Sequence, residues 1–121
     1  MKKSVLGLSL LWLSNYALAE DPVVTDSNKY QVVFQNERVR VMEYRDKPGD
    51  KTNRHNHPDS IVYALSPFKR KLILGNGKEL VVQKNEGETY WVAAQSHVGE
   101  NIGITDTHVI IVELQEIDES K

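Results

Sequence analysis

The stretch KPGDKTNRHNHPDSIVYALS, from Lys47 to Ser66, places two of the four histidines of this chain one residue apart and just before an apolar run. Side chains two residues apart in a β-strand point to the same face of the sheet. If the segment is extended, His55 and His57 therefore share a face. Two imidazoles in that arrangement either bind a common ligand or lie side by side in solvent, and the rest of the chain must decide between these.

On both sides of this stretch, runs of β-branched, aromatic and aliphatic residues alternate with Gly, Asn and Pro turns. The runs predict strands over residues 30–34, 39–44, 61–65, 71–74, 79–83, 89–93, 98–102 and 108–114. The turn Gly75-Asn76-Gly77-Lys78 between two apolar runs is typical of a β-hairpin. The Lys69-Arg70-Lys71 cluster is expected in a solvated loop or at a sheet edge. Short, regularly spaced strands favour an all-β antiparallel barrel or sandwich.

The first 19 residues have the pattern of a secretory signal peptide. Lys2 and Lys3 precede a short apolar run over residues 5–13, and Ala17-Leu18-Ala19 resembles a small-residue cleavage site. The apolar run is shorter than the roughly 20 residues that span a bilayer, so no stable membrane anchor is expected. We expect cleavage near Ala19, a periplasmic or secreted product, an N-terminal lead over 20–29, a barrel over 30–115 and a flexible tail over 116–121.

Charge and cysteine content exclude some classes of protein. The chain has 15 Lys and Arg against 17 Asp and Glu, and removal of Lys2 and Lys3 would leave 13 against 17, a net charge of −4. A mildly acidic domain without a basic patch gives no support to nucleic-acid binding. The chain has no cysteine, so no disulfide stabilises it. Stability must come from the core and from any bound metal.

A third histidine, His97, follows another apolar run in the segment GETYWVAAQSHVGEN. A His-x-His pair on one strand and a histidine from a neighbouring strand would gather three imidazoles. Neutral imidazole suits Zn, Cu, Fe and Ni, and three protein ligands leave positions open for water or substrate. The residues therefore predict a divalent-metal site formed by His55, His57 and His97.

These motifs resemble those of small single-domain cupins of the cupin-2 conserved-barrel type. Gly49, five residues and then His55-x-His57 match the first half of the family's first motif, and Gly87 followed by His97-Val98-Gly99-Glu100-Asn101 resembles its second motif. The resemblance covers nearly all of residues 20–121 and implies an antiparallel double-stranded β-helix, the jelly-roll barrel. Through the sequence HPDxxVY it is similar to cupins of β-alanine degradation.

One part of the family's first motif is absent. The motif normally continues to a glutamate that completes the metal site, but counting forward from His57 leads to Ile61 or Val62, and alignment on the following strand leads to Ser60. Asp59 is an alternative ligand, or else a turn residue after Pro58. The resemblance thus implies a three-histidine site for Fe, Mn, Ni or Zn, whose positive charge favours an anionic ligand.

Other polar and aromatic residues are weaker candidates for the site. His108 is either a core or rim residue or an acid–base group in the pocket. Tyr63, Tyr90 and Trp91 either line the mouth of the barrel or pack within it. Glu43 alternates with Val39 and Val41, so it is either a functional group inside the barrel or lies where the strand leaves the core.

Two functions follow from the resemblance, and a third needs no metal. The first is a metal-dependent enzyme of the oxygenase, isomerase or lyase class that acts on a small carboxylate-bearing molecule. The second is a non-catalytic periplasmic module that binds a metal or a small ligand. The third is a metal-free structural barrel, in which the histidines would be scattered. The resemblance also implies a homodimer.

Overall fold

The computed structural model describes residues 20–116. The predicted signal peptide and residues 117–121 of the predicted tail lie outside this range. Within it, nine strands and one helical turn follow one another: α2 (Pro22–Thr25), β1 (Tyr30–Gln35), β2 (Val39–Asp46), β3 (His55–His57), β4 (Ser60–Ala64), β5 (Phe68–Leu74), β6 (Glu79–Lys84), β7 (Thr89–Val92), β8 (Gln95–Asn101) and β9 (Thr107–Leu114). Among residues 20–116, no helix is long and apolar enough to cross a membrane.

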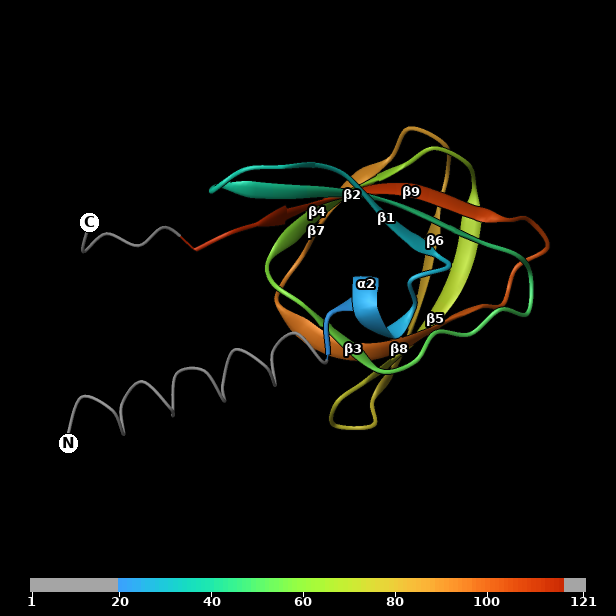
Figure 1. Cartoon of the computed structure of the whole chain (residues 1–121). Helices are drawn as coiled ribbons and strands as arrows, with labels where there is room; N and C mark the ends of the chain where they lie inside the picture. The colour runs from blue at the N-terminus through green and yellow to red at the C-terminus, as the bar shows by residue number, and fades with distance from the viewer. Residues whose placement is uncertain (1–19, 117–121) are drawn as a thin grey trace.

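The strands form two antiparallel sheets that enclose the interior of a barrel (Figure 1). One sheet has the order β1-β2-β9-β4-β7 and the other the order β3-β8-β5-β6. Each predicted strand overlaps one of these, and β3 is an additional short strand formed by the His-x-His segment itself. The predicted turns Gly49, Gly77 and Gly87 have φ near +85 to +89°, a backbone conformation that glycine adopts without steric cost.

Most of the core lies on the inner face of the five-stranded sheet, and Phe68 of β5 joins it from the other sheet. In β2 and β9 the buried residues alternate with partly exposed ones, and the buried hydrophobic set comprises Tyr30, Met42, Tyr44, Val62, Ala64, Phe68, Val109 and Ile111. The face of β2 that carries Val39, Val41 and Glu43 is therefore the outer one. Glu43 is not an interior group, because it lies on the outer face and its carboxylate pairs there with His108.

The prediction for the Lys69-Arg70-Lys71 cluster is wrong. These residues lie in β5, which pairs with β8 on one side and β6 on the other, so they are in a central strand. Arg70 points inward and is only 9% exposed, whereas Lys69 is exposed. Three adjacent positive charges suggest solvent, but a strand can direct the middle one into the barrel because consecutive side chains alternate between faces.

The N-terminal lead is folded onto the barrel. Asp21 caps α2 by accepting a hydrogen bond from the Val23 N–H (2.9 Å), and Pro22 stands at the first turn, where its missing N–H has no cost. The helical turn α2 contacts β1 and β3, and Figure 1 shows it next to β3. Residues 20–29 are thus part of the domain and lie next to the segment that carries His55 and His57.

Candidate metal centre

The fold brings His55, His57 and His97 together on the inner face of the four-stranded sheet. In the antiparallel pairing of β3 and β8, His55 stands opposite His97, and His57 stands two residues further along the same face. All three side chains are buried, and one ring nitrogen from each lies within 4.8 Å of the others. The two distant segments therefore form one cluster, as the spacing of the histidines predicts.

Hydrogen bonds at the outer edge of the rings fix the tautomer of each histidine. The Nδ1 atoms lie 2.8 Å from the Asn53 carbonyl oxygen (His55), 2.7 Å from Glu113 Oε2 (His57) and 2.8 Å from Gln95 Oε1 (His97). These three partners are acceptors, so each Nδ1 carries the hydrogen and donates it. Each Nε2 is then unprotonated and carries a lone pair, which is the form of imidazole that binds a metal.

The orientation of the Gln95 amide is supported by its second contact. Its Nε2 donates to the Ala93 carbonyl oxygen at 3.2 Å, so Oε1 is the atom that faces His97. Gln95 also stands opposite His57 in the β3–β8 pairing. One residue of β8 therefore flanks one histidine and orients another.

A buried carboxylate stands behind His57. Glu113 of β9 is 3% exposed, and besides accepting from His57 it binds Arg40, whose Nε and Nη2 lie 2.9 and 2.7 Å from Glu113 Oε1. Arg40 in turn binds Asp21 of the lead at 2.7 Å. The chain His57–Glu113–Arg40–Asp21 holds the imidazole in place and pairs the buried carboxylate with a guanidinium.

The lead and β1 support His55. The buried carboxylate of Asp26 accepts a hydrogen bond from the Asn53 N–H (3.0 Å) and lies 3.6 Å from His55 Nδ1. On the other side of the ring, the Tyr30 hydroxyl lies 3.2 Å from His55 Nε2. Burial raises the pKa of the Tyr30 hydroxyl above its ordinary value, so this group keeps its hydrogen and donates it to the free nitrogen.

Burial also keeps two of the imidazoles neutral. It lowers the pKa of His55 to about 4, with a further contribution from the positive charge that His57 carries when protonated. Burial, followed by the same repulsion from His57 and His55, lowers the pKa of His97 to about 2. Near neutral pH, His55 and His97 therefore offer lone pairs and do not have to lose a proton before they bind a metal.

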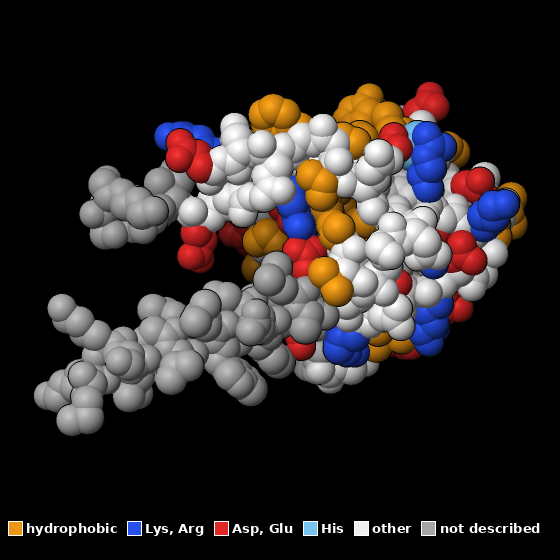
Figure 2. All heavy atoms as spheres, viewed as in Figure 1, with side chains coloured by type: hydrophobic (Ala, Val, Ile, Leu, Met, Phe, Trp, Pro, Cys, Tyr) orange, Lys and Arg blue, Asp and Glu red, His pale blue; other side chains and the backbone are white. Residues whose placement is uncertain are grey.

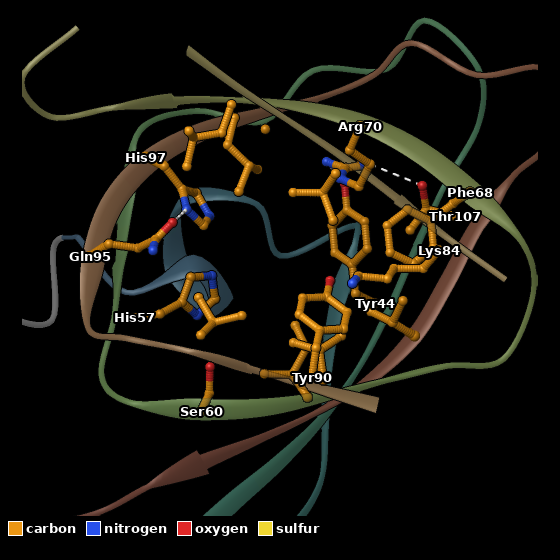
Figure 3. Close-up of a pocket in the computed structure, with 18 of the residues that line it drawn as sticks. Tyr44, His57, Ser60, Phe68, Arg70, Lys84, Tyr90, Gln95, His97 and Thr107 are labelled. Carbon is orange, nitrogen blue, oxygen red and sulfur yellow. Dashed lines mark hydrogen bonds between the residues drawn. The ribbon is translucent and has the colours of Figure 1, made fainter. Parts of the chain in front are cut away.

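The three histidines lie at one end of a cavity of about 450 Å³ inside the barrel. Figure 3 shows His57, His97, Gln95 and Ser60 on one side of this cavity, with Arg70, Lys84 and Tyr90 across it. The wall between them is largely apolar, formed by Val62, Val82, Val92, Val109 and Ile111. A polar end, an apolar middle and a few polar groups opposite are typical of a small-molecule site.

No carboxylate from residues 20–116 joins the histidine cluster. Of the positions where the family's glutamate would fall, Ser60 and Val62 point inward and line the cavity, whereas Ile61 points outward. Figure 3 shows the Ser60 hydroxyl directed toward His57. None of the three positions supplies a carboxylate, and the donor set among residues 20–116 remains three imidazoles.

Three of the other candidates lie away from the cavity. Asp59 is exposed and its carboxylate accepts a hydrogen bond from the Ala94 N–H at 2.8 Å, so it stabilises a loop. Tyr63 points outward and is 44% exposed. His108 lies on the outer face of the sheet, where its Nε2 atom is 3.1 Å from the Oε2 atom of Glu43. It is therefore neither a core residue nor an acid–base group of the pocket. Tyr90 and Trp91 both border the cavity, although the Trp91 side chain is 55% exposed.

The far end of the cavity contains a buried ionic network around Arg70. Its guanidinium donates to Asp46, to Thr107 Oγ1 (3.0 Å) and to the Tyr44 hydroxyl (3.2 Å). Gly99 makes room for it, because a Cβ at this position would lie 2.7 Å from Arg70 Nη2. The glycine of the second motif is therefore explained by the close approach of Arg70.

Sequence reasoning did not identify Glu113, Arg40 or Arg70 as parts of the site. Glu113 is 56 residues from His57 in the sequence and is the last residue but one of the apolar run HVIIVEL. Its position on the same face as Val109 and Ile111 was the one signal available, because a carboxylate on a buried face requires partners. Arg70 lies between two lysines in the sequence, and three adjacent positive charges predict an exposed segment and not a buried arginine.

Solved cupin structures share this fold. A cupin domain from Bordetella pertussis is 27% identical with a TM-score of 0.65, and the match covers 72% of this chain and 92% of that chain. An RmlC-like cupin with a double-stranded β-helix fold from Methanocaldococcus jannaschii is 14% identical with a TM-score of 0.58, over 71% of this chain and 78% of that one. A protein with a double-stranded β-helix domain from Klebsiella pneumoniae is 20% identical with a TM-score of 0.56, over 74% and 75% of the two chains.

No protein-family model matches the chain, and no curated protein matches its sequence. The likeness to cupins therefore rests on the solved structures. It confirms the predicted fold, an antiparallel double-stranded β-helix.

Proposed function

Because this chain is a small cupin in its fold, we propose that it binds one divalent metal ion through the Nε2 atoms of His55, His57 and His97. The observation that carries the proposal is that all three Nδ1 atoms donate to acceptors, which leaves three lone pairs for one ion. Three neutral nitrogen donors fit Fe, Ni or Zn, and the resemblance to cupins adds Mn to the candidates. A metal ion at His55 would replace the hydrogen bond from Tyr30.

The protein then binds a small carboxylate-bearing molecule in the cavity next to the metal. Three neutral ligands leave the full charge of the ion uncompensated, and a bound divalent ion supplies Lewis acidity toward an oxygen of the ligand. The chain itself contributes the apolar wall, which excludes water, and the Glu113 carboxylate, which orients His57. We propose a metal-dependent enzyme of the oxygenase, isomerase or lyase class.

The alternative is a non-catalytic module that binds a metal or a small ligand. One observation favours it: within residues 20–116, no Asp or Glu side chain lines the cavity, so no carboxylate there can act as a general acid or base. A substrate screen with small carboxylic acids and each candidate metal separates the two functions. Turnover supports the enzyme, and binding without turnover supports the module.

Export to the periplasm or the medium is part of the proposal, and it rests on the N-terminal sequence pattern. N-terminal sequencing of the protein from its natural cell fraction would find Glu20 as the first residue if cleavage follows Ala19. The expected homodimer and the likeness to cupins of β-alanine degradation stay predictions. Analytical ultracentrifugation would test the first, and the substrate screen would test the second.

Metal analysis tests the proposed function most directly. Protein purified without a histidine tag or added metal should contain close to one equivalent of a transition metal. His97→Ala should lose it, whereas His108→Ala, which alters a histidine on the outer face, should keep it. Metal at background level in the wild-type protein, together with no uptake from added Zn, Fe, Mn or Ni, would leave the metal-free structural barrel as the better description.

A further inference from the structure

We propose that Lys84 and Tyr90 form an anion-binding subsite across the cavity from the three histidines, so that the ligand is a small dianion, such as a dicarboxylate, with a negative group at each end. The position of the first negative group rests on the proposed metal site. The subsite for the second group depends only on residues that are present in the chain.

The charges around the cavity favour an anion. Among residues 20–116, its lining contains two cations, Arg70 and Lys84, and no acidic side chain. The charge of Arg70 is offset by Asp46, with which it forms a buried ion pair. Within the described range 20–116, the one acidic partner of Lys84 is Glu88 at 3.9 Å, and the carboxylate of Glu88 is 45% exposed. Lys84 is therefore the cation that a ligand would meet.

The position of Lys84 directs its ammonium group into the barrel. It lies at the end of β6 opposite Phe68 of β5, on the same face as Leu80 and Val82, which also line the cavity. Its Nζ stands 4.6 Å from the centre of the Tyr90 ring, and only 27% of the side chain is exposed. An ammonium withdrawn from water without a close carboxylate gains most from an anionic ligand.

Tyr90 offers a second donor at the same place. Burial raises the pKa of its hydroxyl to about 12, and the nearby positive charge of Arg70 acts in the opposite sense, so the group remains an O–H at neutral pH. Among residues 20–116, every fully buried side-chain oxygen has a hydrogen-bond partner, whereas the Tyr90 hydroxyl has none, so this hydroxyl is accessible to water or to a ligand. Tyr90 itself lines the cavity. Figure 3 shows it beside Lys84.

The cavity thus has two electropositive ends. Three neutral imidazoles with a divalent ion form one, and the Lys84 ammonium with the Tyr90 hydroxyl forms the other. The apolar wall between them, which includes Val62, Val109 and Ile111, offers nothing to a polar middle section. A short dianion with a hydrocarbon middle satisfies all three parts of the cavity.

A different role for Lys84 is that of protecting a sheet edge. The strand β6 is an edge strand of the four-stranded sheet, and an inward-pointing charge on such a strand discourages pairing with another molecule. Protection of the edge requires the charge of Lys84 but no ligand. A measurement of anion binding therefore distinguishes edge protection from the proposed subsite.

The test compares succinate with its monoamide, succinamate, which has nearly the same shape and one charge less. Calorimetric titration of the zinc-loaded protein should give succinate the tighter binding by about tenfold, the value of one charge-assisted contact. In Lys84→Gln the two ligands should bind within about twofold of each other, while zinc affinity stays unchanged. Lys84→Arg should retain the preference, and Tyr90→Phe should weaken succinate binding. Lys78→Gln, at an exposed turn, is the matched control.

If Lys84→Gln prefers succinate as strongly as the wild-type protein, Lys84 only protects the strand edge and the proposal is wrong. Equal or absent binding of the two ligands to the wild-type protein would also overturn it. Failure of the metal proposal is recognised separately. If the protein takes up no zinc, acetate titrated into the metal-free protein should still shift the NMR signals of Lys84 and Tyr90, and Lys84→Gln should abolish the shift at Tyr90. No shift in the wild-type protein counts against the subsite.

Discussion

The three imidazoles are held by their outer nitrogens, and Glu113 supplies the one charged acceptor among their three partners. A carboxylate behind a ligating histidine orients the ring and makes its other nitrogen a stronger donor. Arg40 pairs with the same buried carboxylate and so fixes its position behind His57. This one residue connects β9 to a histidine of β3.

Glu113→Gln should weaken metal binding by about 10- to 100-fold, the usual effect of removing such a partner. The amide keeps the shape and one acceptor oxygen but loses the charge that strengthens the His57 hydrogen bond. Competition with a chelator measures the affinity. Glu100→Gln, which alters a half-exposed carboxylate paired with Lys71, is the control. Equal affinities of the two variants would contradict a role of Glu113 at the metal.

Among the strands, β5 has a dual function. Its outer residues face solvent, while Arg70 reaches across the interior and joins Asp46 of β2 and Thr107 of β9. The guanidinium therefore ties the four-stranded sheet to the five-stranded sheet at the end of the cavity away from the histidines. Asn101 of β8 completes the network, since its Nδ2 donates to Asp46 Oδ1 at 3.0 Å.

Arg70→Met should lower the free energy of unfolding by about 3–5 kcal/mol, because it leaves the Asp46 carboxylate buried without its cation. Urea denaturation of the metal-free protein measures the change. The double variant Arg70→Met with Asp46→Asn should recover part of the loss, since the uncompensated charge is then removed. Lys69→Met, at the exposed neighbouring position, should change the stability by less than about 0.5 kcal/mol. A loss equal to that of the control would show that the pair contributes no stability.

The whole barrel keeps the three clustered histidines away from water. Because burial disfavours the protonated form of two of them, the stability of the fold depends on pH. The lead over residues 20–29 closes on β3, the two sheets enclose the cluster, and His55 is fully buried. An unfolded chain exposes the same imidazoles to water, where their pKa is about 6.5. Folding therefore disfavours the protonated form of His55 and His97.

The stability of the metal-free protein should fall as the pH is lowered from about 6.5 to about 5. The pKa of His55 is lowered to about 4 and that of His97 to about 2, so the unfolded state binds more protons over this range. Each of the two histidines then contributes up to about 1.4 kcal/mol per pH unit. Urea denaturation at several pH values measures the slope. His97→Gln should reduce it, and the same slope in this variant would refute the assignment.

Local sequence determines which segments are strands and where they turn. Alternating β-branched residues, the GNGK hairpin and the glycines at positive φ predict every strand except β3, because these signals depend on the backbone preferences of a few adjacent residues. The spacing of His55, His57 and His97 likewise identifies the cluster. Period-2 alternation fixes which side chains share a face of a strand.

Tertiary structure decided which of the two faces lies inside. In β2 both faces carry apolar residues, so Glu43 turned outward with Val41 while Met42 turned inward. In β5 and β9 the tertiary structure likewise determines the inner face. It buries Arg70 and Glu113 and leaves His108 on the outer surface. These outcomes depend on partners far away in the sequence, because a buried charge is stable only where packing brings an opposite charge to it. The three imidazoles could be predicted from the chain, whereas the groups that orient them followed only from the closure of the barrel.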